Sequence, residues 1–353
     1  MYQDTNMEFV NAQGASGPIG QALLNNGMKM NVLRPFIDNQ GRPCISQVQN
    51  DGSVKAQPMN TNAILRKDEW KAIDDAVMRV ERERLVGVAD LQNRGLTYNL
   101  NNPMASTVLE FEKMDDAGTA QMDMDGINRG QNARPRYSTA YLPIPIIHSD
   151  FQFNSRVLAA SRQKGEAIDT TQSENASRRV AEHLEDLLFT DTSYSFGTGT
   201  IYSYLSHPDR IPYTLAGAWT ASAVQGEDIV EDVRSMKQEL INNQFFGPFV
   251  VYIPTGYETV LDEDYVSNYP KTIRQRLLEL SNIDAIKVAD HLPADNVIMV
   301  QMTSNVVRLV TGMANTSVQW ESEGGMAINF KVMSIRVPQI RSDINGSTGI
   351  VHA

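Results

Sequence analysis

Two stretches of the chain have apolar residues at the period of an amphipathic α-helix. In the first, about residues 66–94, apolar side chains recur every three or four residues and charged side chains occupy the opposite side. Gly95 follows, where a glycine commonly ends a helix. The second helix is predicted to start at Thr171-Gln172-Ser173-Glu174, which has the residue types of a capping box. The predicted buried stripes consist of Trp70, Ile73, Val77, Val80, Arg84, Val88 and Leu91 in the first helix, and of Ala176, Val180, Leu184 and Leu187 in the second.

Between these helices the pattern is that of a long hairpin. Strands are predicted at about 105–113 and 136–147, on either side of a polar segment, 114–133. Pro143 and Pro145 have no N–H to donate to a ladder, so the second strand is expected to lie at an edge or to be partly unpaired. An extended hairpin with so little core of its own must pack against something else.

The C-terminal half reads as a compact α/β unit after a loop-rich stretch at 192–225. The elements expected of this unit are helices at 226–243, 255–264 and 270–281 and strands at 249–253, 284–288, 296–302 and 305–311. A short strand is also expected earlier in the chain, before the second helix, around Phe151 and Phe153. Two paired strands, 316–322 and 326–337, close the chain. Alternation of apolar residues slips after Val332, which predicts a β-bulge at Met333-Ser334.

The N-terminal residues 1–62 are rich in Asn, Gln, Gly and Pro, and their apolar residues are scattered. Such a stretch cannot close a core by itself, so we expect an arm that lies on a neighbouring molecule. Cys44 is the only cysteine of the chain, which excludes an internal disulfide and a zinc site built from cysteines.

Charge and length narrow the class of protein. The chain has 353 residues, a net charge of −11 and 41% apolar residues, as expected for an ordered protein with more than one packed unit. It has no basic face of the kind that grips nucleic acid, since its densest basic groups are Arg178-Arg179 and the alternating Arg79, Arg82 and Arg84. The start lacks the features of a signal peptide, and no apolar run approaches a membrane span, so a cytoplasmic, non-membrane protein is predicted.

A search for catalytic or metal-binding patterns finds no candidate site residue. The five histidines (His148, His183, His207, His291 and His352) show no ligand spacing and are interpreted as packing or surface residues. The segment Asp123–Gly126 lacks the spacing of a calcium loop, and Gly197-Thr198-Gly199 lacks the third glycine of a dinucleotide fingerprint. Asp262-Glu263-Asp264 is interpreted as a solvated surface run. We therefore predict no catalytic residue, no metal and no cofactor.

The order of segments, together with local sequence, resembles a known family. The stretches that carry the resemblance are Leu142–Ile146 with Asp150-Phe151, Val180–Phe189, Asn243–Phe249, Leu292–Val297 and Ile335–Val337. These stretches resemble encapsulin-type shell proteins and cover roughly residues 138–345. The order of segments resembles the Hong Kong phage capsid fold, an α+β fold that builds tailed-phage heads and encapsulin nanocompartments.

This resemblance implies a division of the chain into named segments. These are an N-terminal arm at 1–62, an N-terminal helix at 63–95, an E-loop at 96–148, a P-domain at 149–225 together with 316–345, an A-domain at 226–315 and a C-terminal tail at 346–353. Residues Thr171–Thr190 would be the spine helix of the P-domain. Lys113 is the only lysine of the E-loop segment, and no acid–lysine–asparagine constellation for cross-linking is visible in the sequence.

The resemblance also implies a function. The chain is expected to be a non-enzymatic major capsid protein that forms pentamers and hexamers in an icosahedral virion shell, assembled in the host cytoplasm around double-stranded DNA without sequence-specific contacts. Portal, scaffolding and decoration proteins are the expected partners. An encapsulin-like shell enclosing a cargo enzyme is the alternative, although the long arm at 1–62 favours a phage capsid. A third reading, an enzyme in the 226–315 unit, requires a deep pocket with convergent polar groups there.

Overall fold

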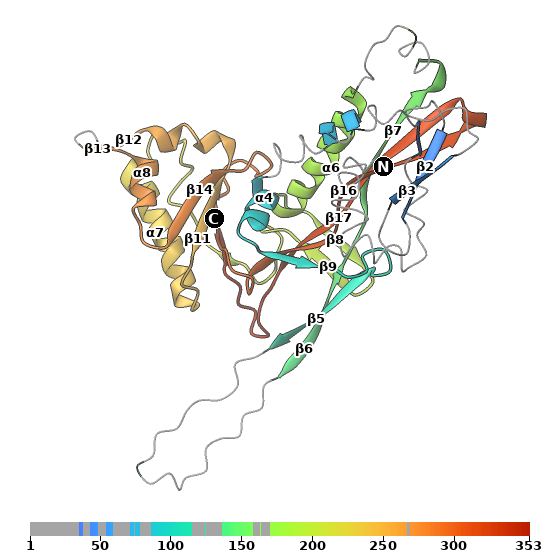
Figure 1. Cartoon of the computed structure of the whole chain (residues 1–353). Helices are drawn as coiled ribbons and strands as arrows, with labels where there is room; N and C mark the ends of the chain where they lie inside the picture. The colour runs from blue at the N-terminus through green and yellow to red at the C-terminus, as the bar shows by residue number, and fades with distance from the viewer. Residues whose placement is uncertain are drawn as a thin grey trace.

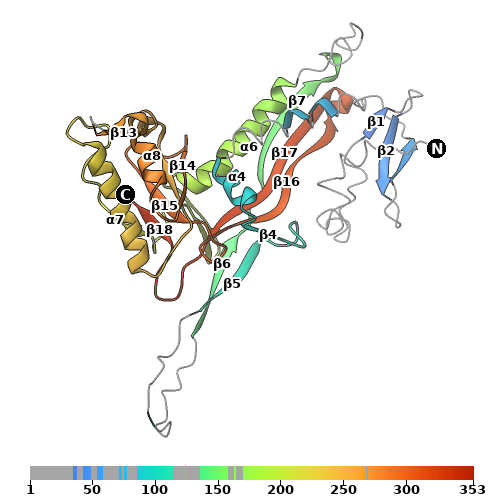
Figure 2. The ribbon, with the colours of Figure 1, turned by 60° about the vertical axis from the view of Figure 1, so that its left-hand side comes forward.

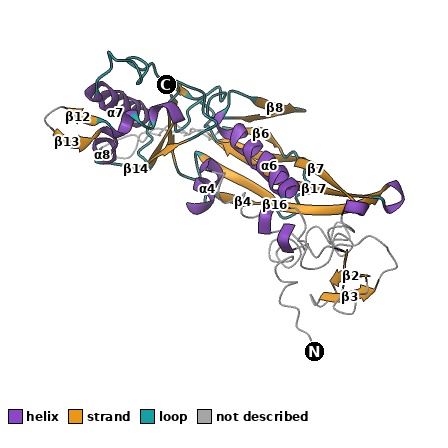
Figure 3. Cartoon of the chain, turned by 90° about the horizontal axis from the view of Figure 1, so that it is seen from above, coloured by secondary structure: helices purple, strands orange, loops and turns teal. Residues whose placement is uncertain are grey.

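The computed structural model describes strands at 35–37, 43–48 and 54–58, helical residues 71–73 and 75–77, and residues 86–114, 124, 136–157, 163, 170–266 and 269–353. In these parts the chain is elongated, with a five-stranded sheet at one end and a four-stranded sheet that extends to the other (Figures 1 and 3). A two-stranded hairpin projects from the middle (Figure 1). The projecting hairpin and several strands of each sheet were predicted from the sequence, whereas β4, β10 and β18 were not.

The four-stranded sheet has the order β4-β16-β17-β7 and carries the long helix α6 on one face (Figure 2). Phe153 and Phe330 from the sheet pack edge to face, with ring centroids 5.6 Å apart, beneath Val180 and Leu184 of α6. The predicted stripe of α6 is therefore its buried face. The bounds are Thr97–Asn99 for β4, Val307–Ser322 for β16, Ala327–Ile340 for β17, Ile147–Asn154 for β7 and Thr171–Phe189 for α6.

The five-stranded sheet has the order β10-β18-β15-β11-β14, and its internal strand β11 is buried on both faces. Val250 and Tyr252 point toward the core beneath α6, whereas Phe249, Val251 and Ile253 belong to a second core with α7 and α8. The five-stranded sheet thus lies between two cores, one beneath α6 and one formed with α7 and α8. The bounds are Ile211–Pro212 for β10, Ile350–His352 for β18, Ile298–Gln301 for β15, Phe249–Ile253 for β11, Ile283–Val288 for β14, Gly226–Asn242 for α7 and Ile273–Leu278 for α8.

The smaller sheets are two-stranded hairpins, apart from one sheet of three strands. The described residues contain β5–β6, β8–β9, β12–β13 and the three-stranded β1-β2-β3, the last of which lies within the predicted arm. Their bounds are Val108–Met114 for β5, Tyr137–Pro143 for β6, Ser193–Phe196 for β8, Gly199–Tyr202 for β9, Asp264–Val266 for β12, Tyr269–Thr272 for β13, Pro35–Ile37 for β1, Pro43–Val48 for β2 and Val54–Pro58 for β3. The stretch 192–225 is accordingly less irregular than predicted.

The first predicted helix ends as expected. Its C-terminal part is α4 (Val86–Asn93), in which Val88 and Leu91 are buried, and helical residues upstream bury Ile73 and Val77. Gly95 has φ = +70°, and the bonds Leu96 N–H to Leu91 O (2.8 Å) and Gly95 N–H to Gln92 O (3.0 Å) form a Schellman motif. Trp70, Val80 and Arg84 lie outside the described residues.

Helix α6 does not begin with the predicted capping box. Thr171 is already helical, and Thr170 before it has φ = −85° and ψ = −4° instead of the extended conformation that an N-cap requires. The Thr170 hydroxyl donates to the Glu174 carboxylate (3.2 Å) and caps no backbone N–H. The residue types of a capping box were present, but the helix starts in a different register.

The strand and helix boundaries in the C-terminal half differ from prediction where tertiary contacts decide them. The predicted strands 305–311 and 316–322 are one strand, β16, which crosses the expected boundary between the A-domain and the P-domain. The bulge falls opposite the predicted place, since the register of β16 shifts between Thr311 and Met313 and again before Thr316. The extra residues therefore belong to β16, and the apparent slip in β17 reflects its partner.

Two predicted helices are shorter than expected. The stretch 255–264 forms only two 3₁₀ turns, Thr255–Tyr257 and Val260–Asp262, because the backbone is extended at Pro254 before them and at Glu263 after them. The stretch 270–281 begins as strand β13 and becomes helical only at Ile273, where the Thr272 hydroxyl accepts from the Gln275 N–H (3.3 Å).

The C-terminal segment 346–353 is part of a sheet and not a free tail. Ile350 and Val351 of β18 are fully buried between β10 and β15. Ala353 exchanges two backbone hydrogen bonds of 2.9 Å with Val297. A short apolar strand of three residues carries too little periodic signal to be recognised, although it lies inside the five-stranded sheet.

Candidate functional site

The projecting hairpin β5–β6 is the most prominent feature that the fold of a single chain leaves uncovered (Figure 2). Its strands pair from Val108↔Pro143 to Met114↔Tyr137, and β6 pairs with no other strand in the described residues, as the two prolines predicted. The strand predicted at 136–147 is interrupted at residues 144–146, after which β7 joins the four-stranded sheet.

The two faces of the hairpin differ in chemistry. Leu109 and Phe111, with Leu142 opposite, turn toward the body of the molecule and pack against a third apolar cluster. The other face carries Glu110 and Glu112, both exposed, opposite Tyr141 and Thr139. Tyr141 is 40% exposed, and Tyr137, which lies opposite Met114 on the same face, is 62% exposed. The outward face is thus acidic and aromatic, and no described residue forms an ion pair with either glutamate.

Near the end of β5 that leads to the tip, the hairpin is attached to the body by polar contacts. Lys113 donates to the Ser342 hydroxyl (2.7 Å) and lies 3.7 Å from the Asp209 carboxylate. A cavity of about 320 Å³ opens here, and His207 lines it. Burial lowers the pKa of His207 to about 4, and its Nδ1 accepts from the Asp209 N–H (3.1 Å), so the imidazole is neutral. Lys113 is therefore engaged within its own chain.

The hairpin is also held by a close backbone approach. A Cβ at Gly199 of β9 would lie 2.8 Å from the Tyr141 carbonyl oxygen and 2.9 Å from Pro143 Cδ, so only glycine lets β9 lie so close to β6. The Gly197-Thr198-Gly199 pattern is thus the turn and first strand residue of the β8–β9 hairpin, which seats β6. It serves backbone packing.

We expect Gly199→Ala to destabilise the hairpin root. The added Cβ meets backbone atoms that cannot move alone, and overpacking of this kind typically costs about 1–3 kcal/mol of unfolding free energy. Chemical denaturation of the purified variant measures the loss. Gly256→Ala is the matched control, since a Cβ there meets nothing within 4 Å, and equal stabilities of the two variants would contradict the close approach.

A buried polar cluster beneath α6 connects α4 and α6 with the five-stranded sheet. Glu185 of α6 is 3% exposed, and its carboxylate accepts from the backbone N–H of Gly87 (2.9 Å) and, more weakly, of Val88 (3.4 Å) in the first turn of α4. A Cβ at Gly87 would lie 2.6 Å from the Phe189 ring, so glycine is needed for this approach. Burial raises the pKa of Glu185 to about 8, against the lowering effect of the two N–H donors.

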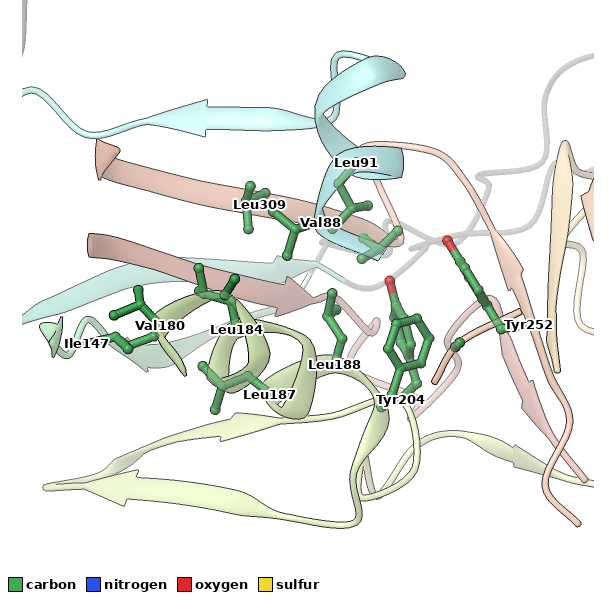
Figure 4. Packing of buried hydrophobic residues seen from close by; sticks show 14 of the residues in the cluster. Val88, Leu91, Ile147, Val180, Leu184, Leu187, Leu188, Tyr204, Tyr252 and Leu309 are labelled. Atoms are coloured by element: carbon green, nitrogen blue, oxygen red, sulfur yellow. The ribbon is translucent and has the colours of Figure 1, made fainter. Parts of the chain in front are cut away.

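The same cluster reaches the five-stranded sheet through Asp90. The Tyr252 hydroxyl of β11 donates to Asp90 Oδ2 (2.9 Å), and Lys287 of β14 forms an ion pair with Asp90 Oδ1. Tyr204 stacks on Tyr252, with centroids 6.2 Å apart, and Figure 4 shows the two rings side by side next to Leu188 and Val88. Asp90 and Glu185 were not singled out in the sequence because both lie within amphipathic helices, where a carboxylate normally marks the solvated side.

In the 226–315 unit the most buried carboxylate is fully engaged in holding structure. Asp232 of α7, 2% exposed, accepts from the Trp219 indole N–H (3.1 Å) and from the Ala216 N–H (3.2 Å). Tyr257 stacks on Trp219 and donates to Asp295 (2.8 Å). This network attaches the 213–219 loop to α7.

Two of the five histidines, His148 and His183, line the same hollow beside α6. His148 and His183 are exposed on β7 and α6, and His291 contacts Asp186 (2.7 Å). His352 bonds Asn296 (2.7 Å) and Arg210 (3.2 Å) in the C-terminal strand. Among the described residues no three His, Cys, Asp or Glu side chains come close enough to hold a metal ion.

Two other stretches that the sequence analysis considered as possible sites are the acidic run at 262–264 and Asp123–Gly126. Asp262 forms an ion pair with Arg274 (3.1 Å), so the acidic run at 262–264 is a partly paired surface. Of the stretch Asp123–Gly126 only Met124 is described, and the calcium-loop interpretation lies outside the described residues. No helix in the described parts has the length and hydropathy to span a membrane.

A second hollow, of about 790 Å³, runs along α6. Its floor includes Val180 and Leu187, and Tyr194 of β8 and Ile146 form part of its wall. Ile146 and Tyr194 are 44% and 45% exposed. Both hollows lie at the four-stranded sheet and its hairpins, and not at the surface of the 226–315 unit where an enzyme site was considered.

Comparison with known proteins shows which proteins this chain is similar to. A family model described as "Family of unknown function (DUF6260)" matches residues 60–353. The type 1 encapsulin shell protein EncA of Myxococcus xanthus (strain DK1622) is 24% identical over 190 residues, 54% of this chain. The match spans 61% of that relative, less than two thirds of its length.

Solved structures with the same fold are shell proteins by their titles. The virus-like particle from Pyrococcus furiosus superimposes with a TM-score of 0.58 and 18% identity, over 80% of this chain and 98% of that one. The capsid of Myoviridae phage XM1 gives a TM-score of 0.57 with 10% identity, over 75% and 91% of the two chains. The chain therefore has an α+β fold of the Hong Kong phage capsid type, and the resemblance seen in its sequence, including the distant encapsulin relative, is confirmed.

Proposed function

The chain belongs to the DUF6260 family of unknown function, and from that premise we propose that it is a self-assembling shell subunit. The observation that carries the proposal is the fold itself, shared over three quarters or more of the chain with a virus-like particle and a phage capsid. The uncovered acidic and aromatic face of β5–β6 supports it, because a two-stranded hairpin is only marginally stable unless other elements cover it. No step of this function needs a catalytic residue or a cofactor.

In the finer form of the proposal the shell is the icosahedral head of a tailed phage and encloses double-stranded DNA. Pentamers and hexamers form through the unit around the five-stranded sheet, and the hairpin and the N-terminal arm lie over neighbouring subunits. Many weak contacts closed by symmetry then hold the shell. Portal, scaffolding and decoration proteins are the partners that such a head requires.

The segment names are part of this proposal. The E-loop is the region around β5–β6, and the P-domain is the four-stranded sheet with α6 as its spine helix. The A-domain is the unit of β11, β14, β15, α7 and α8. We assign residues 346–353 to the A-domain, since β18 lies in its sheet, and we place β16 in both domains.

An encapsulin-like compartment that encloses a cargo enzyme is the second candidate. The match to the Myxococcus shell protein favours it, because that match is in sequence. The N-terminal arm at 1–62 favours the phage reading, and most of it lies outside the described residues. The two candidates share the assembly and differ in what the shell contains.

Negative-stain electron microscopy and sedimentation velocity of the protein expressed alone test the assembly into a shell, which both candidates share. Closed particles, or free pentamers and hexamers, are the expected result. A homogeneous monomer that also stays monomeric under crowding and with a scaffolding partner would remove the proposal. Ultraviolet absorbance and denaturing gels of purified particles then separate the candidates, since enclosed nucleic acid supports the phage head and a co-purified protein supports the compartment.

A further inference from the structure

Two arginines lie next to each other on the four-stranded sheet without a carboxylate partner. Arg308 of β16 pairs with Gln339 of β17, and Arg341 follows two residues later, with its N–H bonded to Val306 O (2.8 Å). This places the two arginines at diagonal positions on one face, where side chains of this length reach one another. Within the described residues neither forms an ion pair. Burial, and after it the charge of Arg341, lower the pKa of Arg308.

The surroundings of this pair offer hydrogen-bond donors and hardly any acceptors. Arg308 Nε donates to Gln339 Oε1 (2.5 Å), and its guanidinium lies 4.4 Å from the centroid of the Tyr98 ring. The Nε2 of the same buried Gln339 amide has no acceptor. The remaining N–H groups of both guanidinium groups therefore lack an acceptor from the described chain. Two like charges held together at a half-buried position are unfavourable unless an anion joins them.

The same chain carries a face of the opposite character. Glu110 and Glu112, two residues apart on β5, point to the same side of the hairpin and have no ion-pair partner in the described residues. Tyr141 and Tyr137 flank them, and tyrosine and arginine are the residues enriched where protein surfaces meet. Guanidinium groups bind carboxylates through two parallel hydrogen bonds, so two arginines and two glutamates are matched in number and geometry.

We propose that the face of Glu110 and Glu112 docks on Arg308 and Arg341 of a second copy of this chain. This rests on the proposed shell function and identifies the surface that receives the hairpin. Within the described residues no ion pair or hydrogen bond joins the two faces in one chain. A second copy is the partner that the chemistry favours over nucleic acid, because the acidic hairpin would repel phosphates and needs a cationic partner of its own.

Charge reversal on each side, and then on both, tests the contact. Glu110→Arg with Glu112→Arg, and Arg308→Glu with Arg341→Glu, are each expected to lower the fraction of protein in particles about tenfold or more, because like charges then face each other. The four changes combined restore opposite charges, and assembly is expected to return to within about twofold of the original level. Arg178→Glu on α6, whose side chain is 48% exposed, is the control for a change of net charge and leaves assembly unchanged.

Circular dichroism and thermal unfolding confirm that each variant is folded before its assembly is scored. If the variant Arg308→Glu with Arg341→Glu does not fold, Arg308→Gln with Arg341→Gln replaces it. This variant is also expected to lower the fraction of protein in particles. Normal particles from both reversed variants, or defects that the combined variant does not relieve, overturn the proposal and leave the shell function in place. An Arg variant that assembles normally but loses enclosed nucleic acid identifies phosphate as the anion and also overturns it. Failure of the unchanged protein to assemble overturns both.

Discussion

A chain shortened by residues 349–353 is expected to lose its cooperative unfolding transition, because it lacks strand β18. Ile350 and Val351 are fully buried, and burial of each such side chain contributes roughly 1.5–3 kcal/mol. The deletion also breaks the ladders to β10 and β15 and opens the five-stranded sheet at a central position. A whole domain is stable by only about 5–15 kcal/mol, so the loss is a large part of the total.

Thermal unfolding followed by circular dichroism, together with limited proteolysis, measures this effect. His352→Gln is the matched control, since it keeps the strand and removes only the imidazole contacts with Asn296 and Arg210. We expect that control to lose about 1 kcal/mol. A shortened chain that unfolds at the temperature of the full chain would show that β18 contributes nothing to the sheet.

The second large effect is a decrease in stability as the pH rises, caused by Glu185. Burial raises the pKa of this carboxyl from 4.5 to about 8 in the folded protein, so between these values the folded chain binds a proton that the unfolded chain has released. Stability is therefore fully present below the unfolded pKa and is lost as the pH rises to about 8. Each unit of the shift corresponds to about 1.4 kcal/mol.

The window from pH 6.5 to pH 8 isolates this group. Burial lowers the pKa values of His207 and His352, so their contribution rises with pH and is complete by their unfolded value near 6.5. Above that pH only the decrease from Glu185 remains, about 2 kcal/mol over the window. Chemical denaturation at a series of pH values measures it.

Glu185→Gln is expected to abolish the decrease, because the amide keeps the shape of the side chain and carries no titrating proton. Glu182→Gln, three residues earlier on the solvated side of α6, is the control and keeps the decrease of the original protein. A flat profile for the original protein between pH 6.5 and 8, or an unchanged slope in Glu185→Gln, would show that the carboxyl does not titrate in this range.

Elements with a strong local period were predictable from the order of residues alone. The stripe of α6 and the turn at Gly95 depend on contacts between residues close in sequence, and β5, β6 and β11 each show the local polarity pattern of a strand, so the sequence records them directly. The order of these elements carried the family resemblance, and the resemblance implied the fold. Absence of a recognisable catalytic motif was equally a property of the sequence.

Tertiary structure decided everything that depends on residues far apart in the chain. β18 is a strand only because β10 and β15 lie on either side of it, and the slip in β17 is caused by extra residues in β16. Glu185 looks like a solvated carboxylate until α4, 98 residues away at Gly87, covers it and supplies N–H donors. The adjacency of Arg308 and Arg341 likewise arises from strand register, because 33 positions separate them in the sequence, and pairing of β16 with β17 alone brings the two charges together.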